Sequence, residues 1–314
     1  MMCIEGVKEG ITMEKTNQGL LIINEFLNAD KFSEQSKWLM EAAKESQISL
    51  QIKTNAEILV HLETGDFKEN YKKYYGDLPD FILFWDKDIR LAMYFEALGI
   101  PVFNSAKAIA NCDDKSMTHL LLTKEGIPMP KTILAPMTFT NIGFNNVKFL
   151  EQVKQKLTFP IVVKECFGSF GAQVYLAKDD KELHDIVLSV GAKPMLFQEY
   201  IKVSEGKDIR LQVVGNKVIT AMYRYSTNGD FRANISNGGS MKPYEPNEIE
   251  VKLALRCCEI LGLNFAGVDI LFGENEERLV CEVNSNAHFK NIFDCTGVNT
   301  ANAIIAYIKE KIYK

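Results

Sequence analysis

The sequence predicts an α/β protein with an N-terminal parallel-sheet domain, followed by two α+β subdomains. Apolar runs of strand length alternate with segments of helical spacing over residues 13–103, which is typical of a parallel sheet. Near the C-terminus, the runs 267–271 and 279–286 are separated by a polar turn and predict a hairpin. With 314 residues, the chain is long enough for two or three domains.

Strands and helices are expected in regular succession through the first third of the chain. The strand candidates are residues 20–26, 48–52, 58–61, 80–85 and 102–104, and the helix candidates are residues 32–45 and 88–98. Gly99 and Pro101 end the second helix, because glycine caps a helix and proline does not continue one. No GxGxxG pattern follows the first strand, so a dinucleotide site is not expected there.

The rest of the chain mixes short strands with amphipathic helices. Helices are expected at residues 108–125, 146–156, 178–190, 247–261 and 300–312, and strands at 132–134, 159–164, 172–176, 195–201, 208–214 and 217–224. The last two strands form a hairpin around Gly215 and Asn216, and a polar loop follows them. We expect three domains, at residues 13–103, 104–196 and 197–314.

Composition excludes several classes of protein. The formal net charge of −5 argues against a large nucleic-acid footprint, which needs a basic face. No apolar run approaches the ~20 residues that span a bilayer, and no signal peptide is visible. Seven cysteines without CxxC spacing indicate reduced thiols. We therefore expect a cytoplasmic protein without nucleic-acid or membrane partners. Residues 1–12 resemble a translated ribosome-binding leader, so Met13 is a candidate native start.

The C-terminal hairpin carries three oxygen-bearing side chains. Because side chains alternate along a strand, Glu282 and Asn284 share one face, while Cys281 and Val283 point to the other. Asp269 lies roughly opposite on the partner strand. Two carboxylates and an amide oxygen are a suitable donor set for Mg²⁺. The alternative is an edge hairpin with polar residues facing solvent.

A lysine and a glycine-rich loop form a phosphate-binding candidate. Lys164 ends a strand, and a tight loop with Gly168, Ser169 and Gly171 follows. Glycines let backbone N–H groups approach an anion, and the lysine adds a point charge. The alternative is an ordinary turn beside a surface lysine. The pattern is not the P-loop, which needs GxxxxGK[ST] at the start of a helix.

Acidic residues in the following strands suggest recognition of a nucleoside. Glu199 could accept from an adenine amine, with backbone groups near Ile201 reading the ring edge, and Asp208 could accept from ribose hydroxyls. Exposed carboxylates at strand ends are the commoner alternative.

Several arginines form a second set of candidates. Arg210 and Arg224 lie on facing strands of one hairpin, and Arg232 lies with Asn234 in the next loop. Arginine side chains suit carboxylate and phosphate oxygens, although surface ion pairs would explain each one separately.

The order of these features resembles the ATP-grasp fold, and more closely the RimK-like amino-acid ligase family. The motifs that carry the resemblance are Gly206-Lys-Asp-Ile-Arg-Leu-Gln-Val-Val214, Gly229-Asp-Phe-Arg-Ala-Asn234, Leu261-Gly-Leu-Asn-Phe-Ala-Gly-Val-Asp-Ile270 and Cys281-Glu-Val-Asn-Ser285. The resemblance covers about residues 80–310. It implies an N-terminal Rossmann-like domain and two α+β subdomains that sandwich ATP.

The resemblance also implies roles for the candidate residues. Lys115 and Lys164 would contact the nucleotide phosphates, under a lid formed by residues 168–171. Adenine and ribose would be bound by Glu199, Ile201 and Asp208, and Mg²⁺ by Asp269, Glu282 and Asn284. Arg210 and Arg224 would hold the acyl phosphate or the acceptor carboxylate.

One loop departs from the family pattern. The ligases usually continue with a Pro-Gly turn after Glu-Val-Asn-Ser, whereas this chain has Asn286-Ala-His-Phe289. The loop faces the substrate in the family, so Asn286 and His288, together with Arg232 and Asn234, are substrate-binding candidates. A solvent-facing loop histidine is the alternative for His288.

The implied activity is an ADP-forming carboxylate–amine ligation through an acyl phosphate, with ATP and two Mg²⁺ ions, or Mn²⁺ in their place. The substrates would be an amino acid, such as glutamate, and a carboxylate-bearing small molecule, peptide or protein. Homo-oligomers are common among the relatives. The alternatives are a biosynthetic ligase of the lysine-pathway carrier-protein, glutathione or D-alanine type, and a non-catalytic ATP-binding regulator.

Overall fold

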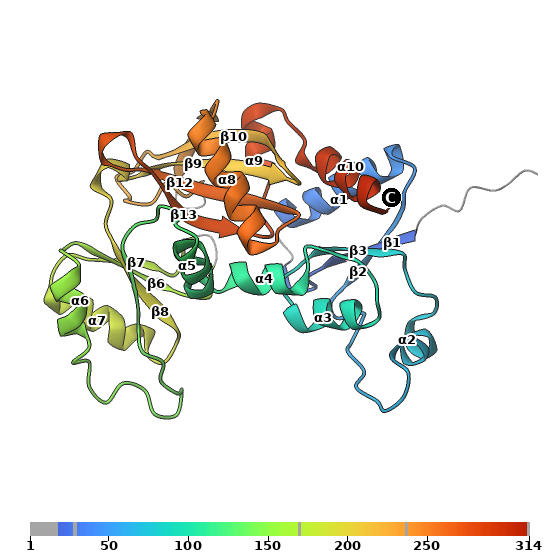
Figure 1. The fold of residues 1–314 in the computed structure, drawn as a ribbon, viewed down its shortest axis with the longest axis horizontal. Coiled ribbons are helices and arrows are strands. Elements are labelled where there is room, and N and C mark those ends of the chain that lie inside the picture. Colours follow the sequence, from blue (N-terminus) through green and yellow to red (C-terminus); the bar gives the residue numbers. More distant parts are fainter. Residues whose placement is uncertain (1–17, 28–29, 169–170, 236–237, 313–314) are drawn as a thin grey trace, which may run out of the picture.

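A computed structural model describes residues 18–27, 30–168, 171–235 and 238–312. The predicted leader and Ser169 lie outside these residues. Three separate sheets organise the described chain (Figure 1). None of its described helices is long and apolar enough to cross a membrane.

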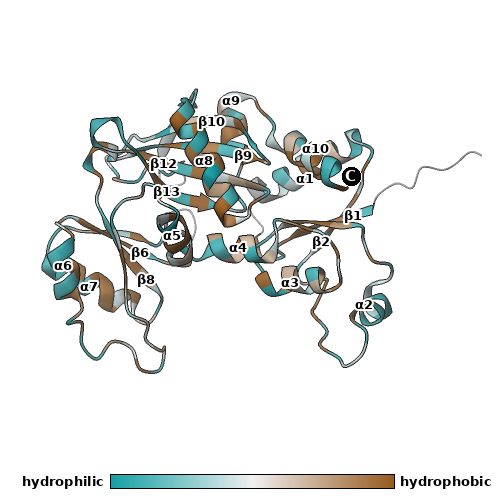
Figure 2. Cartoon of the chain, viewed as in Figure 1, coloured by the Kyte–Doolittle hydropathy of each residue, from teal (hydrophilic) through white to brown (hydrophobic). Residues whose placement is uncertain are grey.

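The first sheet is parallel, as predicted, and has the strand order β2-β1-β3-β4. Its strands are β1 (Gln18–Ile23), β2 (Ser49–Thr54), β3 (Phe81–Trp85) and β4 (Val102–Phe103). Helices α1 (Asp30–Glu45), α2 (Phe67–Tyr75) and α3 (Ile89–Ala97) connect them. Figure 2 shows mostly hydrophobic residues on β3 and mostly hydrophilic residues on the outlying helix α2. Residues of the strands and of helices, among them Tyr71 of α2 and Phe95 of α3, build the core of this part.

The predicted strand at residues 58–61 is wrong, and helix α2 was not predicted. Ile58 is buried against Tyr71 of α2. The hydroxyl of Tyr75 accepts from the amide of Leu59 at 2.8 Å and donates to its carbonyl at 2.9 Å. A side chain from α2 thus satisfies backbone groups that a strand neighbour would otherwise pair.

The second sheet is antiparallel and has the order β5-β8-β6-β7. It consists of β5 (Thr132–Leu134), β6 (Ile161–Glu165), β7 (Val174–Ala177) and β8 (Met195–Glu199). Helices α6 (Leu150–Lys156) and α7 (Asp180–Val190) pack on it around Leu183 and Phe197. Helix α6 begins four residues later than expected from the sequence.

The third sheet is also antiparallel and has the order β11-β10-β9-β12-β13. Its strands are β9 (Lys207–Val214), β10 (Lys217–Ser226), β11 (Gly239–Pro243), β12 (Phe265–Phe272) and β13 (Arg278–Asn284). Single turns of 3-10 helix, η1 (Lys202–Ser204) and η3 (Glu274–Glu276), precede β9 and join β12 to β13. Helix α8 (Glu248–Leu261) covers one face. Strand β11 lies in a segment that the sequence analysis treated as loop.

The predicted helix 108–125 is two helices, α4 (Ala106–Asp113) and α5 (Lys115–Lys124). Asp114 between them has extended backbone (φ −89°, ψ 106°), and its side chain accepts from the amide of Ser116. Asp114 therefore caps a new helix and breaks the old one. Both helices pack against the core of the third sheet through Ala108 and Leu122.

The C-terminal helices pack against the N-terminal part of the chain. Helices α9 (Lys290–Thr296), which was not predicted, and α10 (Thr300–Ile312) follow β13. One buried core joins Leu21 of β1 and Leu39 of α1 to Phe265 of β12 and Ile304 of α10. The parallel sheet and the third sheet therefore share a core, and the space between their edges is fixed by packing.

Candidate functional site

The hairpin of β12 and β13 has the register expected from the sequence, with one exception. Asp269 pairs with Glu282, and Gly267 pairs with Asn284. The register then shifts, so that Ile270 pairs with Val280 and Cys281 is an extra residue in a β-bulge. The prediction that Cys281 and Val283 share a face is therefore wrong. Val283 is buried in the core, whereas Cys281 is half-buried and its Sγ lies 3.5 Å from Nζ of Lys164.

Two lysines, one on β6 of the second sheet and one at the start of α5, converge on β13. Lys164, next to the last residue of β6, is only 7% exposed. Nζ of Lys115, at the start of α5, lies 3.2 Å from Oε1 of Glu282 and 2.9 Å from the carbonyl oxygen of Gly168. Both ammonium groups therefore sit between the glycine-rich loop and the predicted metal hairpin.

The arginines form a buried ion-pair network with the aspartates. Arg210 donates to both carboxylate oxygens of Asp269 at 2.6 Å. Arg224 donates to both oxygens of Asp208 at 2.7 and 2.6 Å and lies 3.0 Å from Asp269. Burial opposes ionisation of Asp269, but the charges of Arg210 and Arg224 outweigh it, so the pKa of Asp269 is lowered.

The pKa of Asp208 is shifted in the opposite direction to that of Asp269. Desolvation raises its pKa more than the charge of Arg224 lowers it. Because both of its oxygens are taken by Arg224, the structure gives Asp208 a partner other than the ribose expected from the sequence. Arg224 itself is only 3% exposed between Asp208 and Asp269.

The oxygen donors of the hairpin fit a hard divalent cation. Asp269 and Glu282 face each other in register, and the amide of Asn284 follows two residues later. Nδ2 of Asn284 is buried and has no hydrogen-bond partner among the described residues, so this amide is not committed to another group. Carboxylate and amide oxygens without sulfur or imidazole ligands suit Mg²⁺. These residues would hold the ion with Arg210 and Lys115 as charged neighbours.

The groups expected to bind the nucleoside lie at the end of β8 and on β9. Glu199 ends β8, and its Oε2 accepts from the amide of Lys131 at 3.3 Å, while Ile201 is half-buried just beyond. Arg232 donates to the carbonyl of Gly171 at 2.6 Å and pairs with Asp230 at 2.7 Å. Arg232 thus ties its own loop to the end of the glycine-rich loop.

His119 is a buried residue that the sequence analysis missed. Its Nε2 lies 3.4 Å from Nε2 of Gln198, and its Nδ1 has no partner within the described chain. Burial, reinforced by the charges of Lys164 and Lys115, lowers its pKa to about 3. Its position four residues after Lys115 was the available signal, because residues i and i+4 share a helix face.

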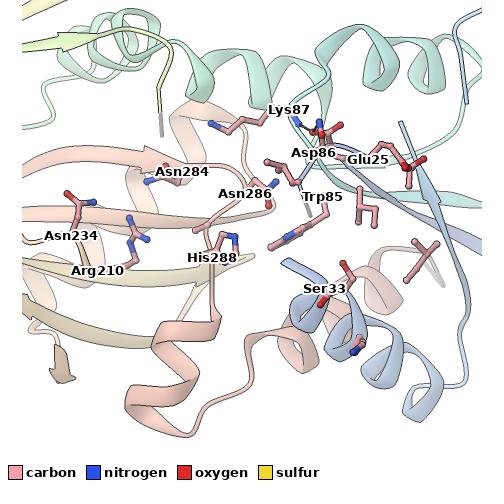
Figure 3. A pocket seen from close by; sticks show the side chains of 18 residues that line it. Glu25, Ser33, Trp85, Asp86, Lys87, Arg210, Asn234, Asn284, Asn286 and His288 are labelled. Atoms are coloured by element: carbon pink, nitrogen blue, oxygen red, sulfur yellow. Dashed lines mark hydrogen bonds between the residues drawn. The ribbon is translucent and has the colours of Figure 1, made fainter. Parts of the chain in front are cut away.

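A cavity of about 770 Å³ opens beside this charged cluster, between the first and third sheets (Figure 3). Five predicted substrate, metal or catalytic residues line it: Arg210, Asn234, Asn284, Asn286 and His288. The ring of His288 contacts Gln35 of α1, so the alternative of a solvent-facing loop histidine is wrong. The other wall comes from the carboxyl ends of β1, β2 and β3.

The residues of that other wall, including Asn24, Trp85, Asp86 and Lys87, were not predicted. The predicted parallel sheet could have indicated these residues, because ligands of open parallel sheets bind at the carboxyl ends of the strands. The sequence analysis had considered this edge only for a dinucleotide.

Comparison with known proteins agrees with the fold. A family model described as the RimK-like ATP-grasp domain matches residues 112–308. The RimK-domain ATP-grasp protein of Sphaerobacter thermophilus has a similar fold, with a TM-score of 0.69, 18% identity and coverage of 92% of this chain and 98% of that one. D-alanine–D-alanine ligase from Bacillus anthracis, solved with ATP, also has a TM-score of 0.69, at 19% identity over 96% of this chain and 99% of that one.

Several known proteins are also related to this chain in sequence. An uncharacterized protein of Mycoplasma pneumoniae, the MG012 homolog, is 32% identical over 90% of this chain and 96% of its own length. A probable alpha-L-glutamate ligase of Psychromonas ingrahamii is 35% identical over 71% of both chains. Human N-acetylaspartylglutamate synthase A is 35% identical over 71% of this chain, which spans 56% of that protein.

The fold and the charged site thus define an ATP-grasp ligase. The chain belongs to the RimK-like ATP-grasp family, whose members use ATP and Mg²⁺, and its class of reaction is the ADP-forming ligation of an acid to an amino acid.

Proposed function

We propose that this protein joins an amino acid, glutamate first among the candidates, to a carboxylate of a small molecule or short peptide. The support comes from relatives named as glutamate ligases and synthases, together with the size of the cavity. The substrates of these relatives are not all assigned to this protein, because the chain spans only about half the length of the human synthase.

The observation that carries the proposal is the meeting of Lys115 with Glu282. It brings the ammonium group at the start of α5 to 3.2 Å from a metal-ligand candidate on β13. A triphosphate between these elements would meet both, with Lys164 beside it. Such preorganised charge is the main means of accelerating phosphoryl transfer.

The proposed reaction needs no nucleophilic side chain. A substrate carboxylate takes the γ-phosphoryl group of ATP and forms an acyl phosphate and ADP, and an amine then displaces phosphate. Lys115 and Lys164 would neutralise phosphate oxygens, and Arg210 would orient the carboxylate in the cavity. Bound Mg²⁺, held by Asp269, Glu282 and Asn284, would supply further positive charge against the triphosphate.

The remaining assignments follow the family pattern. Glu199 and Ile201 are proposed to border adenine, and residues 168–171 to cover the phosphates. Two Mg²⁺ ions are proposed, with Mn²⁺ as a substitute. We retain the three domains at residues 13–103, 104–196 and 197–314 as a proposal, with α4 and α5 packed on the third sheet.

The test is a screen for ADP release by the purified full-length chain. MgATP and glutamate are combined with dicarboxylic acids, amino acids and dipeptides, and products are identified by mass spectrometry. ADP release that requires both an acid and an amine, and an amide product, is expected. Glu282→Gln should reduce it at least 100-fold, whereas Glu274→Gln, in the exposed turn of the same hairpin, should not. Amide formation at the wild-type rate by Glu282→Gln would contradict the metal-site assignment.

A further inference from the structure

The wall of the cavity opposite β13 lies at the point where the order of the parallel sheet reverses. In the order β2-β1-β3-β4, the chain proceeds outward in opposite directions from the neighbouring strands β1 and β3. Asn24 follows β1 and Asp86 follows β3, and Nδ2 of Asn24 donates to Oδ1 of Asp86 at 3.1 Å. Ligands of open α/β sheets bind at such a switch point. Both residues line the cavity.

Asp86 is a buried carboxylate whose hydrogen bonds are incomplete. It is 4% exposed, and Oδ1 accepts from Asn24 and from the amide of Lys87 at 2.7 Å. Oδ2 is buried and has no hydrogen-bond partner in the described chain. The ammonium group of Lys87 lies 2.6 Å from Asp113. A buried acceptor without a donor destabilises the folded state, and more so when it is charged.

The imbalance at Asp86 indicates what kind of ligand would correct it. Burial raises the pKa of Asp86, against the hydrogen bonds from Lys87 and Asn24 that lower it. A cationic N–H donor in the cavity would stabilise the ionised carboxylate, and a turn of the Asp86 side chain toward the cavity would pair it with Oδ2.

The side of the cavity toward the third sheet offers the opposite polarity, whereas the exposed Glu25 lines the cavity next to Asn24. Arg210, Asn284 and Asn286 lie on the side of the third sheet, and the exposed Lys37 on α1 also lines the space (Figure 3). These groups suit carboxylate oxygens. Trp85 adds an apolar surface to the lining.

Trp85 is held rigidly in that position. Its ring packs 5.5 Å, centroid to centroid, from both Phe265 and Phe289. The cavity therefore has a fixed apolar surface beside its polar groups, as ligand pockets commonly do.

We propose that Asp86 binds a free amino group of the carboxylate acceptor, so that the acceptor is an amino acid or short peptide with an unblocked amine. This inference rests on the proposed function. The amino group at Asp86 is not the nucleophile, because a protonated amine has no lone pair. Asp86 would instead select amine-bearing acceptors over N-acylated or amine-free acids, and the cavity is large enough for such a molecule beside the second substrate.

The test compares matched acceptors that differ only at the amine. L-Aspartate, L-glutamate and L-alanyl-L-glutamate are each paired with the N-acetylated form. Calorimetry on the full-length protein, with Mg²⁺ and a non-hydrolysable ATP analogue, measures binding of each member. At least one pair should show about tenfold or greater preference for the free amine. Asp86→Asn should remove this preference, whereas Asp77→Asn, at the opposite end of the same sheet, should keep it.

The proposal is refuted if the free and N-acetylated members of every pair bind with the same affinity, or if neither member of any pair binds. It is also refuted if Asp86→Asn retains the preference for the free amine. The wild-type comparison is decisive by itself if that variant does not fold. Asn24→Ala, which keeps the carboxylate, should weaken the preference by less. ADP release is measured in parallel with binding. A preference for the free amine without ADP release would refute the proposed ligase activity. ADP release without such a preference would refute only the role of Asp86.

Discussion

Arg210 and Asp269 lie opposite each other on β9 and β12 and form a two-pronged ion pair, with both N–O distances equal to 2.6 Å. Arg210 also lines the cavity, while Asp269 is paired in register with Glu282. One arginine therefore connects the proposed carboxylate-binding region to the proposed metal site. Because both side chains project from neighbouring strands of one sheet, their geometry is fixed by the backbone.

The network behind this pair should make a large contribution to stability. Arg224→Met removes the only described side-chain partner of Asp208 and leaves two buried carboxylates close together. We expect the free energy of unfolding to fall by about 3–5 kcal/mol, as for other buried ion pairs that lose one partner. Urea denaturation measures this change.

The control for that variant is Arg256→Met. Arg256 forms exposed ion pairs with Glu259 and Glu125, which contribute little. Its substitution should change stability by less than about 1 kcal/mol. Equal losses in the two variants would show that burial of the network does not determine its contribution.

Lys115→Met should abolish most ligation without unfolding the protein. Its ammonium group contacts Gly168 and Glu282, where the triphosphate is proposed to bind. Loss of one preorganised charge lowers kcat by about 10²–10³-fold. Steady-state ADP release measures the effect, and Lys124→Met at the exposed end of α5 is the control. A Lys115 variant within threefold of wild type would refute the phosphate assignment.

His119 should make stability depend on pH below neutrality. Its pKa is lowered from 6.5 to about 3, mainly by burial, so between these values the unfolded chain binds a proton that the folded chain does not. The contribution of His119 to the free energy of unfolding is fully present above pH 6.5 and is lost as the pH falls toward 3. The slope is at most about 1.4 kcal/mol per pH unit.

His119→Gln should reduce that slope, since glutamine does not titrate. Unfolding free energies at pH 7, 6, 5 and 4.5 provide the comparison. The exposed His184, replaced in the same way, serves as the control. An unchanged slope in His119→Gln would mean that another group accounts for the acid sensitivity.

Phe289 should anchor the third sheet to the first. Its side chain is fully buried, with ring centroids 5.9 Å from Trp38 of α1 and 5.5 Å from Trp85 of β3. Phe289→Ala should cost about 3–5 kcal/mol. Near-ultraviolet circular dichroism would report on the two tryptophans during thermal unfolding. Phe139→Ala, at a side chain that is 59% exposed, should have a small effect, and a similar cost for both would contradict the shared core.

Most individual elements were predictable because they depend on short-range patterns. Short runs rich in apolar residues predicted β1, β3 and β9, and helical spacing predicted α1 and α8. The failures have tertiary causes. The segment at residues 58–61 forms no strand because α2 satisfies its backbone, and α4 and α5 separate where Asp114 caps a helix.

The candidate site was predictable to a similar extent. Motif order identified Asp269, Glu282 and Asn284, and the structure places the first two opposite each other. Alternation gave the wrong side for Cys281, because a bulge adds one residue and no local pattern signals it. Nothing in the local sequence around Asp86 shows that its carboxylate is buried, with one oxygen that has no partner among the described residues.

By itself, the sequence determined the fold class, the family and the order of the chemical groups along the chain, because each depends on residue type and spacing. Only the tertiary structure decided which charges pair with which and where the cavity lies. Arg224 and Asp208 were separate candidates for ligand binding until the β9–β10 register placed them face to face. The physical reason is that burial and Coulomb interactions depend on distances in space, and those distances are set by packing between sheets far apart in the chain.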